Sequence, residues 1–246
     1  MPDEKFVAYI DILGFAIMST KRGKGAEIKL TKFNQSIVDV WKELNLHPEF
    51  NNEEDIYEIN GFTFSDSLII YTRNDSIEGL KKILEFVRKL YKISLFEHNI
   101  MLRGGLAKGK FDIKRPIGLD NLEKNLFYGK AFIDAYNLEN RKGIKGCRFV
   151  FNTAIKDILN RHGIQNLYPS LKLENQKSKI RDYAWINLNE LCENNNKRLN
   201  LFYELAKENK WEEQYSRTLD LFCSIAGINK YDIIKQGISK SSVIPG

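Results

Sequence analysis

The order of strand-like and helix-like segments in the N-terminal half of this chain is the feature that most limits how it can fold. Residues 6–12 alternate and are rich in β-branched and aromatic side chains, which is typical of a strand. From Ile28 to Leu46, apolar residues recur at the spacing of an amphipathic helix. Two strand-like runs follow, then a second helix that Ser76 can cap, and a glycine-interrupted strand at 99–111 completes a β-α-β-β-α-β pattern.

This pattern predicts an α+β fold with a ferredoxin-like βαββαβ core, in which a mainly antiparallel sheet is flanked by helices. The segment "TKRGKG", residues 20–25, predicts a loop. Further predicted elements are a helix at 129–141, a strand at 147–151, a helix at 153–162, a hairpin of 167–174 with 181–188, and helices from about residue 197. We therefore expect a domain of residues 1–190 and a C-terminal helical extension, 191–246, packed on it.

Composition and charge narrow the possible functions. No apolar run approaches the roughly 20 residues of a membrane span, and the N-terminus lacks the apolar core of a signal peptide. The three cysteines and three histidines are scattered, which argues against a zinc site. The net charge of +6 fits a solvated basic surface or an anion-binding one, and the dispersed lysines favour a small phosphate ligand. We expect a cytoplasmic protein without stable nucleic-acid or membrane binding.

One charged side chain, Asp11, stands inside the first predicted strand, in the run "FVAYIDILGF". In a β-α-β-β-α-β sheet the first and third strands are antiparallel neighbours, so Asp11 and Asp66 should reach the same edge. Neighbouring carboxylates repel each other, and divalent cations such as Mg²⁺ compensate their charge. Each aspartate alone also fits an ordinary turn, but together they favour a metal site. Gly14 would let the backbone approach a triphosphate closely.

Four motifs in chain order resemble those of the class III nucleotidyl cyclases: "YIDILGF", "FTFSDS", "RGGLAKG" and "YGKAFIDAYNLE". They fall within residues 6–151, and the residues within these motifs are most similar to those of the bacterial pyrimidine cyclases of Pycsar anti-phage defence. The resemblance implies a metal-dependent cyclase that converts UTP or CTP into cUMP or cCMP and pyrophosphate. It also implies that the product acts on a separate effector gated by cyclic nucleotides.

The resemblance further implies how the site would be assembled. Two Mn²⁺ or Mg²⁺ ions would be held by Asp11, Asp66 and the backbone carbonyl of Ile12. The amides of Gly14 and Phe15 would contact the β- and γ-phosphates. Class III active sites lie across a dimer interface, so the resemblance implies a homodimer with its active sites at that interface.

The chain departs from the purine cyclases of this family at four positions. Phe62 and Leu126 stand where those enzymes read the base, and Ile133 and Asn137 stand where they carry the asparagine and arginine that act in the transition state. These changes fit a cyclase with another base preference or an inactive cyclase. Phe62 and Leu126 would form a smaller, less polar base pocket. Tyr9 would help to shape that pocket, unless it simply packs in the core.

Another cation must replace the missing arginine at the α-phosphate. Arg103, Lys130 and Arg141 are candidates, although each also fits a surface salt bridge. Asn137 could donate a hydrogen bond to the ribose or a phosphate. Two other functions remain open from the sequence. One is a palm-type nucleotidyltransferase that makes a di- or oligonucleotide, although no GGDEF or GGEEF motif occurs, and the other is a catalytically silent nucleotide-binding protein.

Overall fold

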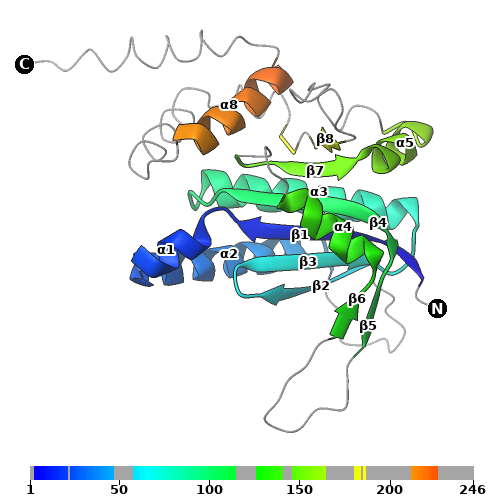
Figure 1. The fold of residues 1–246 in the computed structure, drawn as a ribbon, viewed down its shortest axis with the longest axis horizontal. Coiled ribbons are helices and arrows are strands. Elements are labelled where there is room, and N and C mark those ends of the chain that lie inside the picture. The colour runs from blue at the N-terminus through cyan, green and yellow to red at the C-terminus, as the bar shows by residue number, and fades with distance from the viewer. Residues whose placement is uncertain are drawn as a thin grey trace, which may run out of the picture.

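The structure is a computed structural model that describes residues 3–21, 23–46, 58–114, 126–140, 146–164, 180–183, 185–186 and 212–226. A sheet in the order β2-β3-β1-β4-β7-β8 forms its centre (Figure 1). The strands of the sheet are β1 (Glu4–Ile12), β2 (Ile59–Phe64), β3 (Ser67–Thr72), β4 (Leu102–Lys110), β7 (Phe149–Asn152) and β8 (Ile180–Asp182). A separate ribbon consists of β5 (Asp112–Lys114) and β6 (Leu126–Tyr128).

Strand β1 lies in the middle of the sheet and pairs antiparallel with β3 on one side and β4 on the other. β2 adds antiparallel to β3, β7 adds parallel to β4, and β8 adds antiparallel to β7. The first four strands therefore have ferredoxin-like order, and the predicted α+β fold with a mainly antiparallel sheet is confirmed. β8 overlaps the start of the predicted hairpin strand 181–188, whose predicted partner, 167–174, lies outside the described residues.

Helices cover both faces of this sheet. Their bounds are α1 (Phe15–Lys21), α2 (Gly23–Glu43), α3 (Ile77–Phe96), α4 (Lys130–Glu139), α5 (Thr153–Arg161) and α8 (Glu212–Ala226). In Figure 1, α4 lies in front of the sheet, and α2 and α3 lie behind it. The predicted cap of α3 is confirmed, because the Ser76 side chain accepts a hydrogen bond from the Gly79 amide at 3.1 Å. Within the described residues, no helix has the length and apolar character of a membrane span.

Alternation along β1 divides its side chains between the two layers. Phe6, Ile10 and Ile12 join the main core with α2 and α3. Tyr9 and Asp11 project toward the opposite layer, where the rings and ion pairs of α4 lie. The Asp11 carboxylate therefore lies on the face covered by α4.

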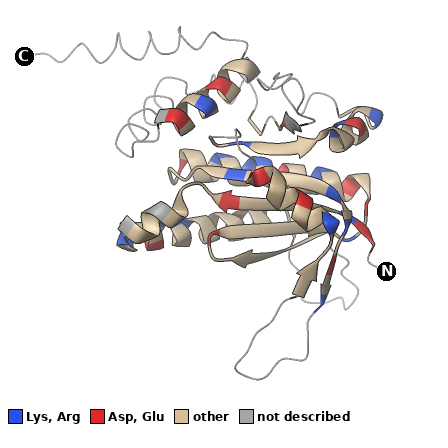
Figure 2. Cartoon of the chain, viewed as in Figure 1, with Lys and Arg blue, Asp and Glu red and all other residues tan. Residues whose placement is uncertain are grey.

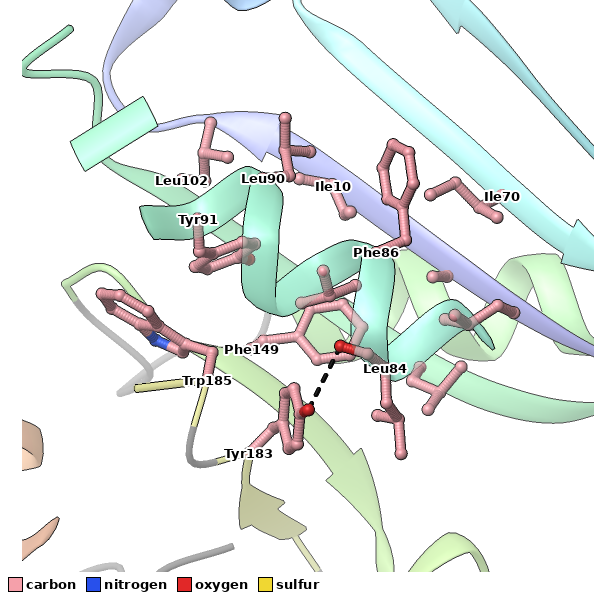
Figure 3. Packing of buried hydrophobic residues seen from close by; sticks show 14 of the residues in the cluster. Ile10, Ile70, Leu84, Phe86, Leu90, Tyr91, Leu102, Phe149, Tyr183 and Trp185 are labelled. Atoms are coloured by element: carbon pink, nitrogen blue, oxygen red, sulfur yellow. Dashed lines mark hydrogen bonds between the residues drawn. The ribbon is translucent and has the colours of Figure 1, made fainter. Parts of the chain in front are cut away.

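The main core extends past the sheet to the C-terminal helix. Figure 3 shows its aromatic side chains around α3, where the Tyr183 hydroxyl donates a hydrogen bond to the Leu84 carbonyl at 3.1 Å. Phe222 of α8 packs against Trp185 with ring centroids 5.5 Å apart. α8 is the described part of the segment 191–246, and it covers apolar side chains at this end of the core.

The loop predicted at 20–25 is wrong. α1 continues to Lys21 and α2 begins at Gly23, so the described residues of this segment are helical. Lysine is a good helix former, and glycine is tolerated at a helix start. Ala26 in the first turn of α2 is buried, which the local glycines do not reveal.

Candidate active site

Asp11 and Asp66 lie together where β1 ends. Asp11 stands opposite Ser67 of β3 and opposite Arg103 of β4. Asp66 occupies the turn between β2 and β3, and its carbonyl accepts a hydrogen bond from the Ile12 amide at 3.2 Å. The antiparallel register thus brings both aspartates to one edge of the sheet. Figure 2 shows acidic and basic positions side by side where β1, β4 and α4 meet.

Several groups at this edge shift the pKa of Asp11. Burial raises the pKa of Asp11 to about 6, and the nearby Asp66 charge adds to the rise. The hydrogen bond from Ser67 and the charge of Arg103 oppose it. Burial and the second aspartate therefore outweigh the serine and the arginine at this carboxylate.

Arg103 bridges Asp11 and a third carboxylate, Glu139 of α4. Its Nη2 atom lies 3.6 Å from Asp11 Oδ2, and its Nε atom pairs with Glu139 Oε1. The Glu139 side chain is almost fully buried, and burial raises its pKa to about 7, although the Arg103 charge pulls it down. One guanidinium therefore serves two carboxylates, one from the sheet and one from the helix.

The close packing of α4 against β4 makes the ion pair between Arg103 and Glu139 possible. Gly105 lies beneath α4, and a Cβ atom at this position would be 2.3 Å from the carbonyl oxygen of Ala135. A side chain at position 105 would therefore push the helix away from the sheet. The glycine lets α4 approach closely enough for Glu139 to reach Arg103.

A hydrogen-bonded chain reaches Asp11 from β3. The Ser67 hydroxyl donates to Asp11 Oδ1 at 3.0 Å, and the Tyr9 hydroxyl lies 2.7 Å from Ser67 Oγ. Phe132 and Tyr136 of α4 pack edge-on against the Tyr9 ring. Tyr9 therefore contacts α4 with its ring and reaches the Asp11 carboxylate through Ser67 with its hydroxyl.

Gly14 follows directly after β1. Its φ of 76° is a left-handed backbone conformation that favours glycine, and α1 begins at the next residue, Phe15. The Gly14 carbonyl accepts a hydrogen bond from the Met18 amide at 3.2 Å, which closes the first turn. The amides of Gly14 and Phe15 thus lie at the same end of β1 as Asp11, and their contact with phosphate stays a prediction.

The predicted base-pocket residues lie in different surroundings. The Phe62 ring is 5.2 Å from the Phe127 ring and belongs to an apolar cluster that Tyr9 also joins. Leu126 is exposed on β6. Phe62 and Tyr9 therefore share one face of the sheet, whereas Leu126 points its apolar surface into solvent.

The remaining candidates do not gather around Asp11. Lys130 pairs with Asp134 one turn along α4, and its side chain is 74% exposed. Asn137 is exposed, and no hydrogen bond within the described residues ties it to the two aspartates. Arg141 lies outside the described residues. Of these cations, Arg103 is the one that contacts Asp11 in the described part of the chain.

Sequence reasoning missed Ser67 and Glu139. The antiparallel pairing of the first and third strands, carried through residue by residue, places Ser67 opposite Asp11. Glu139 follows Ala131 and Ala135 on the buried face of α4, and an acid on such a face needs a partner. Both residues carried a signal in the sequence, but each signal depended on knowing the neighbouring element.

Neither a protein-family model nor the sequence of a curated protein matches this chain. Among solved structures, the catalytic core of a rhodopsin-guanylyl cyclase with converted specificity in complex with ATPalphaS is similar, with a TM-score of 0.50 and 14% sequence identity. The match covers 74% of this chain and 94% of that chain. This chain has the fold of a nucleotide cyclase catalytic core.

A second similar structure is a class III adenylyl cyclase-like ATP-binding protein from Pseudomonas aeruginosa, with a TM-score of 0.44 and 12% identity. That match covers 98% of this chain, which spans 44% of the other protein. At such identities the likeness concerns the fold. The cyclase-type fold implied by the four motifs is confirmed at that level.

Proposed function

We propose that this protein is a metal-dependent nucleotide cyclase that converts UTP or CTP into the 3′,5′-cyclic monophosphate and pyrophosphate. One observation carries the proposal: Asp11 and Asp66 share one edge of a cyclase-type sheet, where burial and the Asp66 charge raise the pKa of Asp11. Paired carboxylates that retain uncompensated negative charge are suited to holding divalent cations.

The residues present fit such cations. Across the described ranges, no three histidines, cysteines or acids group as a metal site, so an ion here would rely on few protein ligands. Asp11, Asp66 and the Ile12 carbonyl would hold Mg²⁺ or Mn²⁺ together with phosphate and water oxygens, as Mg²⁺ prefers. When bound, two ions would lower the pKa of the ribose 3′-hydroxyl and neutralise the leaving pyrophosphate.

Arg103 is our candidate for the cation that meets the charge developing on the α-phosphate. Its guanidinium already lies 3.6 Å from Asp11, and the buried Glu139 holds it there before any substrate arrives. A donor oriented in advance stabilises developing charge without reorganising during the reaction. Arg103 would thus replace the arginine of the resembling enzymes, where this chain has Asn137.

The triphosphate and ribose would lie next to this arginine. The Gly14 and Phe15 amides, at the same end of β1 as Asp11, would contact the β- and γ-phosphates. Lys130 and Asn137 are both exposed on α4 and available to a ribose or phosphate group. Lys130 would first have to exchange its pairing with Asp134 for that contact.

The preference for a pyrimidine is proposed from the aromatic surface near β2. Phe62 stands where the resembling purine cyclases carry a base-reading lysine, and its ring packs with Phe127. The Tyr9 ring belongs to the same apolar cluster. An apolar surface of this kind favours a small base over one that must be recognised by a charged group. Leu126 is exposed, so it would contact the base only from the rim of the pocket.

A homodimer with active sites at its interface belongs to the same proposal. Large apolar side chains on β2, β6 and α4 remain exposed: Phe64 (72%), Leu126 (52%), Ile133 (55%) and Tyr136 (44%). Large exposed apolar surfaces mark interaction sites, and we propose that these side chains contribute to the dimer interface. A role in anti-phage signalling, through a separate effector gated by cyclic nucleotides, rests on the motif resemblance alone.

One assay tests the reaction. The purified protein is incubated with Mn²⁺ and each of the four ribonucleoside triphosphates, and the products are identified by mass spectrometry. We expect cUMP or cCMP from the wild type, no product from Asp66→Ala, and unchanged product from Glu43→Ala, which removes an exposed acid paired with Lys89 on α3. Linear or cyclic dinucleotides would identify a nucleotidyltransferase instead. Nucleotide binding without turnover would identify a silent protein. This is the second candidate, because Asn137 stands where the resembling purine cyclases carry an arginine.

A further inference from the structure

The hydrogen-bonded chain from Tyr9 to Asp11 has a defined direction. A serine hydroxyl carries one proton, and Ser67 donates it to Asp11 Oδ1 at 3.0 Å. The Tyr9 hydroxyl, 2.7 Å from Ser67 Oγ, must therefore be the donor in the second bond. Tyr9 thus orients Ser67, and Ser67 orients Asp11.

The two oxygens of Asp11 have different partners as a result. Oδ1 accepts the bond from Ser67, whereas Oδ2 faces Arg103 at 3.6 Å. Rotation of the carboxylate would break the first contact and move the second. The Ser67 hydroxyl therefore selects one orientation of Asp11 out of those that its side chain can adopt.

Helix α4 in turn holds Tyr9. The Tyr9 ring packs edge-on against Tyr136, with centroids 5.2 Å apart, and against Phe132 at 6.2 Å. The position of α4 is itself set by Gly105, which stands beside Tyr9 in the register of β1 with β4. A continuous set of contacts thus runs from the helix through two hydroxyls to the carboxylate.

We propose that Tyr9 and Ser67 are positioning residues. They link the position of α4 on the sheet to the orientation of the Asp11 carboxylate, and so set the affinity of Asp11 for a divalent cation. The inference rests on the proposed function for the identity of the ion. Groups that hydrogen-bond to a metal ligand orient it, and their loss typically costs about 10- to 100-fold in metal affinity.

The test measures Mn²⁺ binding to the nucleotide-free protein by electron paramagnetic resonance. We expect Ser67→Ala to weaken binding about 10- to 100-fold and Ser67→Thr, which keeps a hydroxyl, to restore most of it. Tyr9→Phe should weaken binding less, because Ser67 can still donate. In the Ser67→Ala background, Tyr9→Phe should add nothing, since the two residues act in series. Tyr128→Phe, which removes a hydroxyl bonded to Asp112, is the matched control and should bind normally.

Three results would overturn the inference: no Mn²⁺ binding by the wild type, full affinity in Ser67→Ala, or an additive effect of Tyr9→Phe in the double variant. Product formation is measured on the same samples. If the inference holds, a higher Mn²⁺ concentration restores the rate of the Ser67→Ala variant. A wild type that binds Mn²⁺ with the expected pattern of variants but forms no cyclic nucleotide would refute the proposed function and leave the positioning role intact.

Discussion

Replacing Glu139 with glutamine should change how the stability of this protein depends on pH. The side chain is 2% exposed, and burial raises its pKa from 4.5 to about 7. Between these two values, the folded protein binds more protons at this position than the unfolded chain does. Its free energy of unfolding must therefore fall as the pH rises through the window, and the fall ends above the folded pKa.

The size of the effect follows from the two pKa values. A tenfold change in an equilibrium constant corresponds to about 1.4 kcal/mol, so the rise from 4.5 to about 7 sets an upper bound between about 3 and 4 kcal/mol. Glutamine has the shape of the protonated acid and never ionises. The stability of Glu139→Gln relative to the wild type should therefore improve by about 2 to 3 kcal/mol between pH 5 and pH 8.

Urea unfolding followed by tryptophan fluorescence at pH 5, 6, 7 and 8, with a chelator present, measures this difference. Glu43→Gln, an exposed glutamate that pairs with Lys89, is the control and should show a small difference that hardly changes with pH. A Glu139→Gln difference that stays constant from pH 5 to pH 8 would refute the reasoning. It would mean that the Arg103 ion pair fully offsets the cost of burying the carboxylate.

Two further predictions concern packing and buried charge. Gly105→Ala should cost on the order of 1–3 kcal/mol, because its Cβ would lie 2.3 Å from the Ala135 carbonyl oxygen, and the loss is measured as a lower urea midpoint. Gly109→Ala on the same strand, where the nearest atom is 3.4 Å away, should be nearly neutral, and equal losses would contradict this explanation. Asp182→Asn should cost about 3–5 kcal/mol, because Arg148 keeps its charge at 6% exposure without a counter-ion. Arg148→Met in the same chain should recover part of that loss, and an unchanged midpoint in Asp182→Asn would refute the prediction.

Much of the fold could be predicted because strand and helix periodicity are local properties. The spacing of apolar residues separates β1, α2, β3 and α3, and Ser76 marks the start of α3. The antiparallel order then requires Asp11 and Asp66 to reach one edge. The helical ends of α1 and α2 could not be predicted in this way, because the glycines near residue 23 suggest a loop, whereas α2 begins at Gly23 and buries Ala26 in its first turn.

The amino-acid sequence by itself determined the order of the elements, the face of each that is apolar, and the edge that carries the two aspartates. Tertiary structure decided which group each buried polar side chain meets. Glu139 reaches Arg103 because α4 sits directly on Gly105, and Tyr9 reaches Asp11 through a serine on another strand. Such partners depend on the distance and register between elements that are far apart in the chain, and local residue patterns do not contain that information.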